Sequence, residues 1–294
     1  MQADSETVFR RLYPVEYFTR WLSEGIRPDG RTLGRSRATT IGLGALPSLH
    51  GSAMVRLGEG ATAVLAGAKA SVVQPAEEAP QQGILNVSVS MASFATPDYR
   101  AGRQADAVSV VTERLQGALS LLRLADQLCI REGKSVYKVD LDIYILSADG
   151  ALVDAVLLAA VAALRDLTLP AVKPAKASSA SKAGAPSEVE AAGGEAVVAH
   201  KLSIPCWPLS VTCCMHNQHL LVDPTAEEEA IATSTISVLT DAAGGLHGVF
   251  KSGGAATASP AILLQCIESA KIRCKEVLSL MQQAVDAADA AMQA

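Results

Sequence analysis

Hydrophobic and polar residues alternate along much of the chain with the period of a β-strand. Residues 135–146 (SVYKVDLDIYIL) are the clearest case, with Val139 and Leu141 on one face and Asp140 and Asp142 on the other. This alternation predicts a strand with one buried face. Shorter segments of the same kind predict further strands at residues 38–44, 52–58, 62–73, 84–91, 209–216, 219–223, 232–241 and 245–251.

Four other segments space their apolar residues with the period of a helix. Residues 6–24 predict an amphipathic helix that must break or kink at Pro14. Residues 104–124, 151–164 and 260–291 predict three more helices. Strands and helices therefore follow one another in two groups, which predicts an α+β fold with two similar halves.

Between residues 173 and 201 the composition changes to Ala, Ser, Gly, Pro and charged residues. Such a segment buries too little apolar surface to offset its ordering entropy, which predicts a flexible insertion. The predicted organisation is a helical extension over 1–25, a first half over 26–172, the insertion over 173–201 and a second half over 202–294.

The segment 145–164 (ILSADGALVDAVLLAAVAAL) runs from a strand through an Asp-Gly turn into an apolar helix. Free backbone N–H groups at such a helix start could hold a phosphate. Phosphate sites usually add a cation, yet no Lys, Arg or His lies between Asp149 and Leu164. The turn therefore has the backbone of an anion site without its usual positive charge.

Composition narrows the function classes only slightly. The chain is 49% hydrophobic with a net charge of −5, and no run of about 18 uncharged apolar residues predicts a membrane span. The charged N-terminus lacks the apolar core of a signal peptide. Six cysteines, without a C-x-x-C pair or zinc spacing, are interpreted as reduced thiols of an intracellular protein.

Several of these segments together resemble RNase PH-type proteins. The resemblance rests on RPDGR at 27–31, the turn and helix at 147–164, LLVDPTAEEEAIATSTISVLTD at 220–241 and the closing Gly-Gly turn and helix after Lys251. It implies an RNase PH fold with mixed β-sheets and packed helices. Family members form six-unit rings around a pore that admits single-stranded RNA, and active members degrade RNA by phosphorolysis.

The VDPT-x-EEE and D-G-x-x-x-D-A forms resemble the catalytically silent ring subunits of the eukaryotic exosome. Active members carry a Ser/Thr-Arg turn where this chain has Leu152 and Val153. An arginine fork offsets the repulsion between phosphate and phosphodiester, and Val153 provides neither charge nor donor. The expectation is a non-catalytic ring subunit, with no catalytic residue; the alternative is an active phosphate-dependent 3′-to-5′ exoribonuclease.

Two acids match positions that active members use. Asp223 and Glu229 lie six residues apart, in the same pattern. The preferred interpretation is that Asp223 begins a turn and that the acidic run 227–229 is solvated. Without a phosphate cradle, these acids alone would not make a phosphorolase.

By the same resemblance, Arg100 and Arg103 are candidate RNA contacts, with surface or intersubunit arginines as an equal alternative. Arg27, Arg31 and Arg35 are expected to serve interface or structural roles. The five histidines lie on turns or strand ends with no carboxylate placed to orient them, so neither a metal nor a cofactor is expected.

The resemblance also implies the partners. They are other RNase PH-like exosome ring subunits, cap RNA-binding subunits and single-stranded RNA, with no membrane. The expected role is to support processing and degradation of ribosomal and messenger RNA, in the nucleus, including the nucleolus, and in the cytoplasm.

Overall fold

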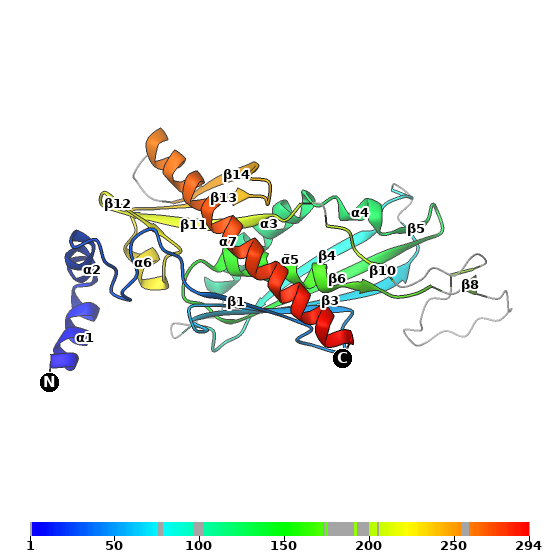
Figure 1. Ribbon diagram of the computed structural model, residues 1–294, viewed down its shortest axis with the longest axis horizontal. Helices are drawn as coiled ribbons and strands as arrows, with labels where there is room; N and C mark the ends of the chain where they lie inside the picture. The colour runs from blue at the N-terminus through cyan, green and yellow to red at the C-terminus, as the bar shows by residue number, and fades with distance from the viewer. Residues whose placement is uncertain are drawn as a thin grey trace.

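The protein is an elongated α+β molecule in which a six-stranded and a four-stranded sheet pack around a central helix (Figure 1). The computed structural model describes residues 2–75, 79–96, 103–172, 174–175, 191–192, 200–204, 206–253 and 259–293. Its helices are α1 (Gln2–Leu12), α2 (Pro14–Ser23), α3 (Arg103–Ser120), α4 (Leu124–Gln127), α5 (Leu152–Asp166), α6 (Ala226–Ile231) and α7 (Pro260–Gln293).

The larger sheet has the order β1-β2-β3-β6-β4, with β5 paired to the end of β6. All its neighbours are antiparallel except β4 and β6, which run parallel. Along β6, Val139, Leu141 and Ile143 are buried whereas Asp142 and Tyr144 are exposed, which confirms the predicted alternation. The strands are β1 (Thr39–Leu43), β2 (Gly51–Leu57), β3 (Thr62–Val73), β4 (Ile84–Met91), β5 (Cys129–Arg131) and β6 (Ser135–Ser147).

The smaller sheet has the order β12-β11-β13-β14 and is antiparallel throughout. Cys213 and Cys214 are neighbours on β11 and point to opposite faces. Cys213 packs in one apolar cluster with Ile236, and Cys214 packs in another with Leu22. The strands are β11 (Leu209–His216), β12 (His219–Val222), β13 (Ser234–Thr240) and β14 (Leu246–Ser252).

Helix α5 is the centre of the core. Every residue from Ala155 to Leu164 is buried, and the helix contacts β1, β2, β3 and β6 on one side and β11 on the other. The alanines of α5 let the backbones of neighbouring strands approach the helix closely. At Gly51 of β2 the approach is so close that a Cβ would lie 2.6 Å from the Cα of Leu167, just after the helix. A helix that is apolar on every face, as α5 is from Ala155 to Leu164, is typically buried on all sides.

The long helix α7 crosses the molecule and touches both sheets, through β1 in one and β11, β12 and β13 in the other (Figure 1). Its apolar residues are spaced as the sequence predicts, and those buried are Cys266, Ala270, Cys274, Val277, Met281 and Val285. At the other terminus, α2 begins at Pro14, so the predicted break is confirmed.

Two short strand pairs involve the predicted insertion over 173–201, and only β7 lies outside it. β7 (Thr168–Leu169) pairs with β10 (His200–Lys201), and β8 (Pro174–Ala175) pairs with β9 (Ala191–Ala192). The prediction of a flexible insertion over 173–201 falls mostly outside the described residues. Among the helices described, none combines the length and apolar character that a membrane crossing requires.

Candidate functional site

The turn that opens α5 contacts the segment between β12 and α6. Gly150 has a φ of +71°, and a Cβ at this position would lie 2.3 Å from the carbonyl oxygen of Pro224. Only glycine combines this dihedral with so close an approach. Asp149 Oδ1 accepts a hydrogen bond from the Ala226 N–H at 3.0 Å, so the two segments are joined by side chain and backbone.

The N-terminus of α5 already has an anionic partner within the chain. The N–H of Ala151 donates to Glu229 Oε1 at 2.8 Å. A carboxylate thus accepts from the backbone where the sequence suggests a phosphate. Burial raises the pKa of Glu229, although this hydrogen bond opposes the shift.

The acidic run 227–229 is solvated only at Glu227, whereas the sequence analysis interprets the whole run as solvated. Glu228 is 1% exposed and forms a two-point ion pair with Arg27, which is fully buried. Glu228 also completes a capping box with Thr225 at the start of α6. Of the three glutamates only Glu227 is exposed, and it pairs with Arg10. The pattern of three acids gave no sign that one would face inward toward an arginine 201 residues away.

The carboxylate of Asp223 is also paired with an arginine of the chain. Its Oδ1 accepts from Nη2 of Arg37 at 2.7 Å, and its Oδ2 accepts from the Arg37 backbone N–H at 2.7 Å. Burial alone would raise its pKa, but the hydrogen bonds and charge of Arg37, with the nearby charge of Arg31, hold the pKa of Asp223 below its ordinary value. A carboxylate held ionised by two arginines is a poor proton acceptor.

Arg27 and Arg31 therefore stabilise the protein from within. Arg27 donates to the carbonyl oxygens of Val222 and Asp223 in addition to Glu228. Arg31 donates to Asp29 and to the carbonyl oxygen of Asp223. These contacts agree with the structural role that the sequence favours over RNA binding for this loop.

Val153, where the resemblance implies an arginine in active members, lies beside a very small cavity. Val153 lines a space of about 10 Å³ together with Arg114, Ser237 and Phe250. This volume is at most that of one water. Arg114 lies 5.5 Å from the centre of the Phe250 ring and 3.4 Å from the Ser237 hydroxyl. Val153 therefore packs beside a side chain of α3 and side chains of the smaller sheet.

Asp154, one residue further along α5, is the second aspartate of the D-G-x-x-x-D-A form and is largely removed from solvent. Its two oxygens accept from the N–H and the hydroxyl of Thr212, at 2.6 and 2.9 Å. Burial raises its pKa to about 6. The sequence gives no sign of its partner Thr212, which lies 58 residues away.

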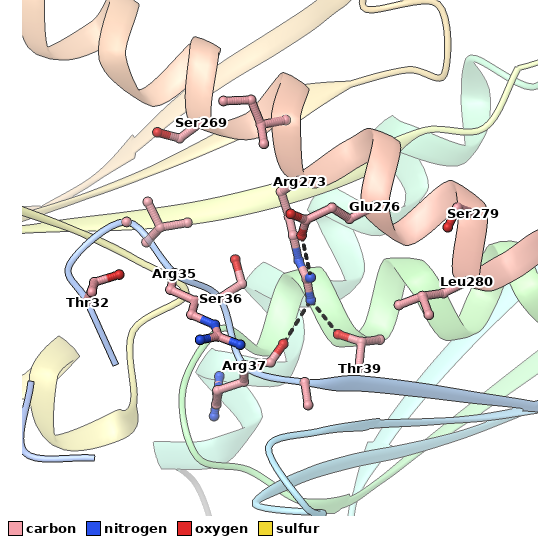
Figure 2. Close-up of a pocket in the computed structure, with 14 residues that line it drawn as sticks. Thr32, Arg35, Ser36, Arg37, Thr39, Ser269, Arg273, Glu276, Ser279 and Leu280 are labelled. Carbon is pink, nitrogen blue, oxygen red and sulfur yellow. Dashed lines mark hydrogen bonds and ion pairs between the residues drawn. The ribbon is translucent and has the colours of Figure 1, made fainter. Parts of the chain in front are cut away.

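A larger groove runs between α7 and the segment 32–39, and Figure 2 shows the side chains that line it. Its volume is about 810 Å³. Arg273 crosses from α7 to donate to Glu276, to the Arg37 carbonyl oxygen and to the Thr39 hydroxyl. Arg35 is exposed, and the structure gives its guanidinium no partner among the described residues. The groove therefore presents positive charge but no free acid–base pair.

The two arginines predicted to contact RNA cannot be placed. Arg100 lies outside the described residues, and of Arg103 only the backbone, at the start of α3, is described. Their role stays a prediction. One expectation about the histidines is wrong, because Asp241 Oδ2 lies 2.8 Å from His247 Nε2. The sequence missed this carboxylate, which the β13–β14 hairpin brings back to the histidine.

Comparison with known proteins matches both halves of the chain to one family. The description "3′ exoribonuclease family, domain 1" fits residues 35–170, and domain 2 of the same family fits residues 206–273. The chain is 33% identical over 237 residues to exosome complex component Rrp42 of Thermoplasma acidophilum, covering 80% of this chain and 82% of the relative. It is 26% identical to exosome complex component rrp43 of Schizosaccharomyces pombe, covering 90% and 94%.

Solved structures of exosome proteins share this fold. A chain of the Archaeoglobus fulgidus exosome with RNA bound to the active site superposes with a TM-score of 0.73 at 25% identity, covering 90% of this chain and 96% of that one. Rice Rrp46 superposes with a TM-score of 0.61 at 17% identity, which speaks for the fold alone.

Proposed function

Because the chain belongs to the RNase PH family of 3′ exoribonucleases and their relatives in the exosome core, we propose that it is a non-catalytic subunit of an exosome ring. Its role is to support 3′-to-5′ processing and degradation of RNA by the assembly and to help line the RNA channel. One observation carries this proposal: the anion-binding start of α5 is closed by the chain's own residues.

The contact between Ala151 and Glu229 bears directly on phosphorolysis. Phosphorolysis needs inorganic phosphate beside an RNA phosphodiester, and electrostatic stabilisation is usually the largest catalytic contribution. Here the Ala151 N–H is paired with Glu229, and Arg37 is paired with Asp223. Leu152 and Val153 stand where the resemblance implies a hydroxyl and a guanidinium. A phosphate approaching this turn would meet carboxylates rather than free cations.

The proposed partners are other RNase PH-like ring subunits, cap RNA-binding subunits and single-stranded RNA. The exposed edge strand β14 supports a role in assembly, since it presents Leu246, Val249 and Phe250 to solvent. Apolar edge strands are usually covered in the native assembly. The proposed location is the nucleus, including the nucleolus, and the cytoplasm.

The test is release of nucleoside diphosphates from single-stranded RNA in the presence and absence of inorganic phosphate. It is run on the isolated chain and on the chain assembled with its ring neighbours. Glu229→Gln is the key variant, because glutamine keeps an oxygen that accepts from Ala151 but removes the carboxylate. Asp223→Ala is a poor choice, since it would leave Arg37 buried without its partner.

We expect no phosphate-dependent release from the isolated chain, and equal release from rings built with the wild-type chain or with Glu229→Gln. Rings should also protect bound RNA from an added nuclease. Phosphate-dependent release by the isolated chain that Glu229→Gln abolishes would contradict the proposal and support an active exoribonuclease.

A further inference from the structure

Three potential metal ligands meet at one end of the smaller sheet. Cys206 precedes β11, Asp241 follows β13 and His247 lies in β14. Cys206 Sγ lies 3.8 Å from Asp241 Oδ2 and 3.9 Å from His247 Nε2, and the latter two atoms are 2.8 Å apart. Among the described residues, no other group of three His, Cys, Asp or Glu donors was found within such a radius.

These separations suit a tetrahedral ion. With zinc–ligand distances of about 2.3 Å for sulfur and about 2.1 Å for nitrogen or oxygen, ligand atoms lie about 3.6 Å apart for sulfur–nitrogen and about 3.4 Å apart for nitrogen–oxygen. The observed separations need changes of no more than roughly 0.6 Å to meet this geometry. Small rotations of exposed or half-buried side chains supply such changes.

The carboxylate is held in place by its own turn. Asp241 Oδ1 accepts from the Gly245 N–H at 2.7 Å, and the Asp241 carbonyl oxygen accepts from the Gly244 N–H at 3.0 Å. A Cβ on Gly245 would lie 2.7 Å from Asp241 Oδ2, so glycine permits this close packing. Hydrogen bonds of this kind orient a metal ligand before the ion binds.

The donor set also selects the ion. A thiolate and an imidazole favour zinc over magnesium or calcium, which prefer oxygen ligands. Cys206 stands 35 residues from Asp241 and 41 residues from His247, so no short motif reveals the group. This explains why the sequence alone indicates no metal.

We propose that Cys206, Asp241 and His247 form a three-ligand zinc site with water in the fourth position. The ion would tie the segment entering β11 to the β13–β14 hairpin. This site is separate from the turn that opens α5, and its existence does not depend on the proposed ring function.

The test is a cobalt(II) titration of the full-length chain, reduced and freed of chelators. Cobalt reports its ligands through a thiolate charge-transfer band and through visible bands typical of tetrahedral coordination. We expect one equivalent to bind and to be displaced by zinc. Cys206→Ser should remove the thiolate band, and His247→Gln should weaken binding at least ~10-fold. Cys129→Ser, a half-buried cysteine outside the group, is the matched control and should keep both signals.

Zinc should also raise the melting temperature of the wild-type chain and of Cys129→Ser, but not that of Cys206→Ser. A missing thiolate band, a band that survives Cys206→Ser, or an equal zinc-induced shift in all three proteins would overturn the proposal. His247 and Asp241 would then form an ion pair beside an unrelated thiol.

Discussion

The turn that opens α5 and the groove along α7 both contact the segment 32–39, and they differ in whether they leave an arginine without a partner. At the turn, Arg27 and Arg37 are buried and each is matched by a carboxylate of the same chain. In the groove, Arg35 is exposed and its guanidinium has no partner in the described part of the chain. The first region is internally neutralised, whereas the second leaves charge available to another molecule.

This difference indicates where the protein can bind an anion and where it cannot. A buried arginine that has its carboxylate contributes to folding and cannot bind phosphate without breaking that pair, which costs several kcal/mol. An exposed arginine pays no such cost. Any anionic partner is therefore expected at the groove rather than at the turn that opens α5.

The largest expected effect comes from breaking the pair at the turn. Arg27→Met should lower the free energy of unfolding by about 3–5 kcal/mol, because Glu228 would remain buried and charged without a partner. Chemical denaturation measures the loss. Arg10→Met is the control, since its pair with Glu227 is exposed and should cost under about 1 kcal/mol. Equal small losses in both variants would mean that the buried pair stabilises the protein no more than the exposed pair does.

Asp154 should make stability depend on pH at the same end of α5. Its pKa rises from the ordinary 3.8 to about 6 in the folded protein, so the folded state holds a proton that the unfolded state has released. This contribution is fully present below about pH 4 and is lost as the pH rises through about 6. The loss amounts to at most about 3 kcal/mol.

Asp154→Asn should therefore become more stable relative to wild type as the pH rises from about 4 to about 7. Denaturation across that range measures the difference. Asp126→Asn, on an exposed surface of α4, should show no such trend. A pH-independent difference between Asp154→Asn and wild type would contradict the assignment.

Gly150→Ala should separate backbone geometry from charge at the turn. The positive φ and the 2.3 Å approach to the Pro224 carbonyl oxygen predict a loss of about 1–3 kcal/mol in the free energy of unfolding. Gly117→Ala is the counterpart in α3, where a Cβ meets nothing within 4 Å and should stabilise by about 0.5–1 kcal/mol. Two substitutions of the same kind should thus shift the denaturation midpoint in opposite directions.

The smallest effects are expected in the groove. Arg273→Ala removes two hydrogen bonds that tie α7 to Arg37 and Thr39, and one to Glu276 within α7, and should cost about 1–2 kcal/mol. Arg35→Ala should change stability by no more than about 0.5 kcal/mol. A large loss from Arg35→Ala, measured by the same denaturation, would mean that Arg35 belongs to the fold and would remove the contrast between the two regions.

Much of the secondary structure could be read from one-dimensional patterns. The period of two in β6, the break at Pro14 and the apolar stripe of α7 each report which face of an element meets the core. The helix predicted over 104–124 ends early, at Ser120, because Arg123 takes a left-handed conformation in the turn that follows. Local patterns specify that an element exists better than they specify its last residue.

Sequence patterns revealed only part of the candidate site. Leu152 and Val153 stand where the resemblance implies a hydroxyl and a guanidinium, and residue type alone is enough to see that difference. The burial of Glu228 was misjudged, because a run of three acids ordinarily marks a solvated surface. Its partner Arg27 lies 201 residues away and enters only when the first loop packs under α6.

The sequence by itself thus determined the main strands and helices and the α+β class, because these depend on periodicity and residue type. Only the tertiary structure decided that Glu229 closes the start of α5, that Asp223 is held by Arg37, and that Cys206 meets Asp241 and His247. The physical reason is that a polar side chain's pKa and role depend on which group is buried against it, and long-range packing chooses that group.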